Sequence, residues 1–113
     1  DLLETNKVDS GIKALTTASK VWPDDWLSYF LLANHFYSIK DVNTSVYWFE
    51  QGLTFSSAIE QPDFLNNYAY VLARLGDKDK SLELIDKAIS IEPENQSLKD
   101  TKREITQMLA ELD

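Results

Sequence analysis

Apolar residues recur along this chain at the three- and four-residue spacing that places side chains on one face of a helix. The clearest example surrounds NNYAYVLARLGDKDK, residues 66–80. One apolar face is formed by Leu65, Tyr68, Ala69 and Leu72, and a second one, further along, by Leu82, Ile85, Ala88 and Ile89. The polar break RLGD lies between the two faces. The pattern therefore predicts two helices joined by a tight turn.

The same pattern occurs 36 residues earlier. The first face is then Tyr29, Leu32, Ala33 and Phe36, and the second is Val46, Phe49, Gly52 and Leu53. Each copy has an aspartate, Asp41 or Asp77, near the predicted start of its second helix. A partial copy precedes both, with Gly11, Leu15, Ala18 and Pro23 in matching positions. We expect an all-α fold built from repeated helical hairpins.

The later copy also resembles the tetratricopeptide repeat (TPR) family, whose unit of about 34 residues has the pattern W-x2-L-G-x2-Y, then A-x3-F, then P. The matching residues here are Leu65, Tyr68, Ala69, Leu72, Ser81, Ile85, Ala88 and Pro93. The earlier copy keeps the spacing, but it has Gly52 in place of the usual alanine and Ser57 in place of the usual proline. The resemblance implies a right-handed superhelical stack of antiparallel helix hairpins, a TPR-like α-solenoid.

We predict one domain over residues 1–113, with a partial repeat at 1–25, a repeat with a lengthened linker at 26–61, a repeat at 62–95 and a capping helix at 96–113. The cap is indicated by one apolar stripe among charged residues: Leu98, Ile105, Leu109 and Leu112. The first segment is too short for a whole hairpin. We therefore expect further repeats, or another copy in a homo-oligomer, to stack on an open N-terminal end.

Composition and charge narrow the possible functions. The chain has no cysteine, which excludes a disulfide framework and thiolate metal sites. Its net charge of −8 and the lack of a basic cluster oppose binding to nucleic acid. No apolar run is long enough for membrane insertion. The sequence indicates a soluble protein and leaves its compartment open, with a slight preference for the cytoplasm.

The sequence offers little for catalysis. His35 is the one histidine, and its helical position predicts a solvated side chain away from the packing face. The spacing Asp77-x-Asp79-x-Ser81 is similar to the start of a calcium loop, but Leu82 stands where the loop needs glycine. No nucleophile, phosphate-loop or zinc motif is present. We predict that the chain is not an enzyme and needs no metal or cofactor.

Residues beside the packing faces are the candidates for partner contact. With 3.6 residues per turn, a second face lies about 100° from the packing face of each first helix. In tetratricopeptide repeats the first helices line a concave groove, so the resemblance implies that this second face contacts a peptide. The predicted peptide-binding groove comprises Leu27, Phe30, Asn34, Tyr37, Asp63, Asn66, Asn67, Tyr70 and Arg74.

The asparagines have two possible roles. A carboxamide can hold a peptide backbone because it both donates and accepts hydrogen bonds, and the resemblance implies this role for Asn34 and Asn67. Alternatively, Asn66 and Asn67 only occupy the first turn of a helix, where short polar side chains pair with backbone groups.

The partner's chemistry follows from the neighbouring positions. Family members that bind acidic C-termini add basic residues to two asparagines, but the matching basic positions here hold Phe30, Ser97 and Thr101. Phe30, Tyr37 and Tyr70 instead offer apolar area with polar tips. We therefore predict a non-catalytic scaffold that binds a protein or peptide, neutral to basic, with apolar anchors.

Two alternatives to this function stay open. One is a structural or self-assembly segment of a longer repeat protein that stacks through the N-terminal end. The other is a contact surface on the outer side, around Tyr47 and Trp48, which lie off the packing face of their helix.

Overall fold

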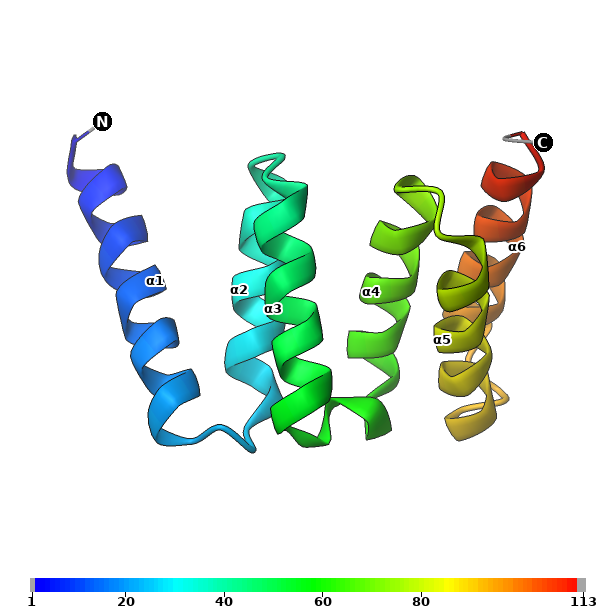
Figure 1. Cartoon of the computed structure of the whole chain (residues 1–113), viewed down its shortest axis with the longest axis horizontal. Helices are drawn as coiled ribbons and strands as arrows, with labels where there is room; N and C mark the ends of the chain where they lie inside the picture. Colours follow the sequence, from blue (N-terminus) through cyan, green and yellow to red (C-terminus); the bar gives the residue numbers. More distant parts are fainter. Residues whose placement is uncertain (1, 112–113) are drawn as a thin grey trace. The chain divides into compact units, whose positions relative to one another are not determined.

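The computed structural model describes the backbone of residues 2–111 and the side chains of residues 7–111 (Figure 1). Over that range the chain forms six α-helices and one short 3-10 helix, without a strand. They are α1 (Leu2–Val21), α2 (Trp26–Ser38), α3 (Val42–Phe55), the 3-10 helix η1 (Ser57–Glu60), α4 (Pro62–Arg74), α5 (Lys78–Ile91) and α6 (Gln96–Ala110). The prediction of an all-α fold of helical hairpins is confirmed. The chain divides into two compact units, Asp1–Ser57 and Ala58–Asp113.

In the first unit, α2 packs against both of its neighbours in the sequence, α1 and α3. Figure 1 shows α2 in cyan beside α3 in green. The core of this hairpin contains Leu32, Ala33 and Phe49, all fully buried, because the apolar faces of the two helices meet there. The turn from α1 is held by the buried Tyr29 hydroxyl, which donates to the carbonyl oxygens of Ser19 and Pro23 at 3.2 and 3.1 Å.

In the second unit, α4 pairs with α5, and α6 contacts both. Tyr68, Leu65, Ile85 and Ile105 are fully buried at the centre. The remaining residues of the predicted capping stripe, Leu98 and Leu109, are buried as well, and Leu112 lies outside the described residues. The charged residues of α6 are exposed except for the half-buried Lys102, so this helix covers the α4–α5 hairpin with one face and meets solvent with the other.

Each of the two hairpins contains an equivalent buried hydrogen bond. The Ser45 hydroxyl donates to the Ala33 carbonyl at 2.8 Å, and 36 residues later the Ser81 hydroxyl donates to the Ala69 carbonyl at the same distance. Both alanines are fully buried. The small side chain is needed at these positions because a larger one would hold the paired helices apart. The repetition seen in the sequence is therefore also a repetition of contacts.

The tight turns within the hairpins are equivalent too. The residue after the C-cap of each first helix has a positive φ, 67° at Lys40 and 84° at Gly76. In the first turn the amides of Lys40 and Asp41 bond back to the carbonyls of Tyr37 and Phe36, which is a Schellman ending. As predicted, Asp41 and Asp77 begin the second helices, where each carboxylate accepts a backbone N–H.

The connections between hairpins differ in length. The segments 22–25 and 92–95 both form a proline turn that ends in an N-cap residue, Asp25 or Asn95. The connection 56–61 is longer and contains the 3-10 helix. The predicted extra length of this linker is thus taken up in one helical turn, with Ala58 fully buried.

Candidate functional site

In the first unit, the predicted groove residues Leu27, Phe30, Asn34 and Tyr37 all lie on α2. Asp25 fixes the start of this helix by accepting the Leu27 amide at 3.1 Å, which sets the register of the face. Leu27 is 46% exposed, and the other three side chains are half-buried. The face therefore offers one aliphatic and two aromatic side chains around a carboxamide.

Trp26 also lies on this face, although it was not among the predicted groove residues. Its ring lies 5.3 Å from the ring of Phe30, tilted by 58°. The two residues are four apart on α2, so helical spacing could have found the pair. Because the contact restricts Phe30, the aromatic side chain is held in place before any partner arrives.

In the second unit, the predicted residues Asp63, Asn66, Asn67, Tyr70 and Arg74 all lie on α4. Asp63 and Arg74 are exposed, at opposite ends of the helix, and the other three are half-buried. Two carboxamides and one phenol therefore occupy the middle of this face, with one charge of each sign at its ends. This arrangement favours recognition by hydrogen bonds over recognition by net charge.

The asparagines do not begin a helix. The N-cap of α4 is Gln61, and Pro62 is the first helical residue, so Asn66 and Asn67 lie in the second turn. The interpretation of these asparagines as first-turn residues is therefore wrong. The 3-10 helix of the linker ends at Glu60, so α4 already begins at Pro62. The polar pattern of the sequence had suggested a later start for this helix.

Asn66 has an unmet acceptor. Its Nδ2 donates to Oδ1 of Asn67 at 3.3 Å, which joins the two carboxamides. Its own Oδ1 is buried and receives no hydrogen bond from the described residues. A buried carbonyl without a donor costs roughly 1–3 kcal/mol of stability. A hydrogen bond to this atom would remove that cost. The sequence had given the leading role to Asn67 instead.

Arg74 lines a hollow of about 440 Å³ between α4 and α6, together with Ala73, Met108 and Glu111. The guanidinium and the Glu111 carboxylate give it one charge of each sign, and Met108 supplies an adaptable apolar wall. Both Asp100 and Glu104 lie exposed on α6. The same helix also carries Lys99, Lys102 and Arg103, so its charges do not make the surroundings of Arg74 acidic.

The outer surface of the first unit has a hollow of its own. It encloses about 310 Å³ and is lined by Ser19, Lys20, Pro23, Tyr29, Tyr47, Trp48, Gln51 and Phe55. The Trp48 ring lies 6.3 Å from Tyr29 and 5.1 Å from Tyr47. Trp48 is half-buried by this packing, whereas Tyr47 is exposed. Much of the aromatic surface noted in the sequence therefore belongs to the packing of the unit.

Tyr29 is a titratable residue of the first unit whose surroundings shift its pKa. Burial raises the pKa of the Tyr29 phenol above its usual value, and the nearby Asp24 carboxylate adds to the shift. His35 is half-buried against Phe36, with ring centres 5.2 Å apart, so the prediction of a solvated histidine is only partly right. In the described part of the chain, no three His, Asp or Glu side chains lie together as a metal site requires.

Comparison with known families agrees with this architecture of repeated helical hairpins. A tetratricopeptide repeat model matches residues 1–58, and a second tetratricopeptide repeat model matches residues 62–95. The chain belongs to the tetratricopeptide repeat family. Repeats of this family are generally non-catalytic scaffolds for protein–protein interaction. No curated protein matches the chain.

Between residues 2 and 111, no helix is both long enough and apolar enough to cross a membrane.

Proposed function

We propose that the chain is a peptide-binding module in which the first helices of its repeats, α2 and α4, contact an extended or helical peptide. The observation that carries the proposal is the buried Asn66 Oδ1 without a donor, on a face where every other predicted residue is at least partly exposed. When the Asn66 carboxamide turns toward the surface, a backbone N–H of a bound peptide is the donor that fits, because such groups recur at regular spacing along any partner.

The aromatic residues supply the affinity in this proposal. Phe30, Tyr37 and Tyr70 are half-buried, so each combines a fixed position with free surface for contact. Aromatic anchors of this kind carry much of the binding energy at protein interfaces, while hydrogen bonds fix the register. The Asn34 carboxamide serves the same purpose on α2 as Asn66 does on α4.

The charge of the surroundings selects among peptides. Asp63, Asp100 and Glu104 are exposed, and Arg74 is accompanied by Glu111. The α6 helix also carries three cations, but the whole chain has a net charge of −8, which opposes the approach of an acidic peptide and not that of a neutral or basic one. The proposed ligand is therefore a neutral-to-basic peptide with apolar side chains at its centre.

The test uses peptides selected for binding to the intact chain from a random-sequence display library. Asn66→Ala combined with Asn67→Ala should weaken their binding about tenfold to a hundredfold, as the loss of two or more hydrogen bonds predicts. Asn43→Ala, at an exposed asparagine on α3, is the matched control and should leave affinity unchanged. Isothermal titration calorimetry gives the affinities, and a melting curve for each variant shows that it is folded.

If the double variant binds as tightly as the control, the carboxamides take no part in binding and the proposal fails. Failure would also follow if the selected peptides were predominantly acidic.

A further inference from the structure

The hollow on the outer surface of the first unit keeps exposed aromatic area after the unit has packed. Trp48 packs against Tyr29, but Tyr47 is 51% exposed and Phe55 is 57% exposed. Tyr47, Gln51 and Phe55 follow one another at intervals of about one helical turn along α3. Their side chains therefore form a row on one side of the hollow, about 12 Å long at 1.5 Å per residue.

The next repeat shows that folding does not require this row. At the equivalent positions 36 residues later, α5 has Glu83 in the place of Tyr47 and Lys87 in the place of Gln51, and both are exposed. The equivalent buried hydrogen bonds of the two hairpins show that this register is correct. The tyrosine and the carboxamide of α3 can therefore contact a ligand without a loss of packing within the unit.

The polar groups that remain around the hollow are mainly hydrogen-bond donors. The hydroxyls of Ser19 and Tyr29 already donate to backbone carbonyls within the unit. The indole N–H of Trp48 and the carboxamide of Gln51 have no hydrogen-bond partner among the described residues, and Lys20 adds an ammonium group. No carboxylate belongs to the described residues that line the hollow. A ligand with many acceptors and few donors therefore fits this surface.

The charges beside the hollow have both signs. Lys20 is exposed, and so are Asp24 and Asp25 in the adjoining turn and Glu50 on α3. A charged peptide of either sign would therefore meet like charges as well as opposite ones. Recognition at this surface depends on rings and donors, so the ligand that fits is uncharged.

We propose that this hollow binds a proline-rich segment of a partner protein in the polyproline II conformation. Proline has no backbone N–H, so such a segment offers carbonyl acceptors without the matching donors. One turn of polyproline II spans about 9 Å, so prolines three residues apart fit within the row from Tyr47 to Phe55. The proline rings pack against the aromatic side chains, and the Trp48 indole donates to a carbonyl of the segment. None of the proposed peptide-binding residues lines this hollow, so the two proposals are independent.

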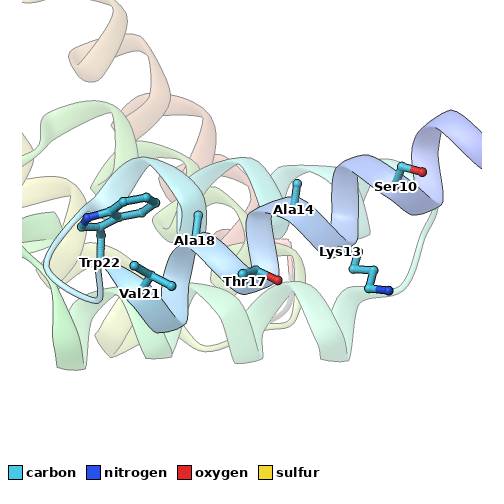
Figure 2. Close-up of a pocket in the computed structure, with 7 residues that line it drawn as sticks. All are labelled: Ser10, Lys13, Ala14, Thr17, Ala18, Val21 and Trp22. Atoms are coloured by element: carbon cyan, nitrogen blue, oxygen red, sulfur yellow. The ribbon is translucent and has the colours of Figure 1, made fainter.

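The test uses the intact, isotope-labelled chain and octaproline as the probe. The three tryptophans report on three surfaces: Trp48 on this hollow, Trp26 on the peptide-binding face of α2, and Trp22 on a hollow of about 480 Å³ along α1 (Figure 2). Octaproline should shift the NMR signal of the Trp48 indole in a saturable way and leave the other two unmoved. A glycine–serine peptide of the same length, which has no rings and keeps its N–H groups, should not bind.

A double variant locates the contact. Tyr47→Glu combined with Gln51→Lys gives α3 the residues that α5 has at these positions, and it should weaken binding about tenfold or more without unfolding the chain. Thr106→Glu combined with Ala110→Lys is the matched control, because it adds the same charges at two exposed positions of α6, and it should leave binding unchanged. A melting curve for each variant shows that it is folded.

A single variant tests the donor. Trp48→Phe keeps an aromatic ring but removes the N–H, so it should weaken octaproline binding about twofold to tenfold, while Trp22→Phe should leave it unchanged. The proposal is overturned if no indole signal shifts, or if Trp26 shifts in place of Trp48. It is overturned as well if the glycine–serine peptide binds equally, or if the α3 double variant or Trp48→Phe behaves like its control.

Discussion

Lys40 occupies a backbone conformation that the equivalent position in the next repeat gives to glycine, with φ of 67° against 84° at Gly76. A side chain in this region costs about 1–2 kcal/mol, and glycine avoids the cost but loses more entropy on folding. Lys40→Gly should therefore raise the free energy of unfolding by about 0.5–1 kcal/mol. Urea denaturation followed by circular dichroism measures the change.

The opposite substitution is the control. Gly76→Lys should lower the free energy of unfolding, since it brings to the second turn the strain now present in the first. Equal effects of the same sign in both variants would show that backbone conformation does not decide stability at these turns.

Tyr29 links α1 to α2 and gives the protein a dependence on high pH. Because burial raises its pKa in the folded protein, the unfolded chain loses the phenolic proton first as the pH rises above about 10. Stability contributed by the protonated phenol is therefore complete below pH 10 and falls above it. Tyr29→Phe, which removes the hydroxyl's bonds to Ser19 and Pro23, should cost about 1 kcal/mol at pH 7.

The difference between wild type and Tyr29→Phe should then shrink between pH 10 and 11, because only wild type loses the contribution of the phenol. Urea denaturation at pH 7, 10 and 11 gives the comparison. A difference that stays constant across this range would mean that the Tyr29 proton is not coupled to folding.

Among single residues, the sequence predicted the packing positions better than the polar ones. Leu32, Phe49 and Tyr68 are buried because spacing alone places them on an apolar face. The unmet acceptor of Asn66 could not be predicted in the same way. It depends on which neighbour pairs with which end of a carboxamide, and that is a matter of side-chain geometry that periodicity does not contain.

At the scale of elements, α6 closes the second unit with a single apolar stripe. Ile105 is fully buried between α6 and the hairpin, so Ile105→Ala should lower the free energy of unfolding by about 2–5 kcal/mol. Ile91→Ala, at a residue that is 38% exposed on α5, is the matched control and should cost about 1 kcal/mol or less. Amide hydrogen exchange of α4–α6 reports the loss for this unit. Similar costs at both sites would mean that α6 is not part of the folded core.

The helices and their order were predictable because each has an apolar face at helical spacing and a turn signal at its end. The 3-10 helix at Ser57–Glu60 was not predictable, because its sequence SAIE has no periodic pattern and lies within the predicted linker. The helix start at Pro62 followed from this turn, so the role of the asparagines as possible helix-start residues could be decided only in three dimensions.

For the molecule as a whole, membership in a family of interaction scaffolds makes a protein or peptide the expected class of partner, and the net charge of −8 is why we propose a neutral-to-basic one. Repeats define the fold through local contacts between neighbouring helices, and these contacts are encoded in short stretches of sequence. The sequence indicates the face for a partner only indirectly, as the residues that lie beside the packing positions. This is why the sequence could name the candidate residues but could not select among the α2 and α4 faces, the Tyr47 surface and the N-terminal end.

The most direct test of the peptide-binding proposal is an NMR titration of the isotope-labelled chain with a neutral-to-basic peptide selected by display. The side-chain amide signals of Asn34 and Asn66 should shift in proportion to occupancy, together with backbone signals of α2 and α4. In the Asn66→Ala, Asn67→Ala variant the remaining shifts should need a higher peptide concentration. Shifts confined to Tyr47 and Trp48, or to the hollow on α1, with the Asn34 and Asn66 amides unmoved, would contradict the account.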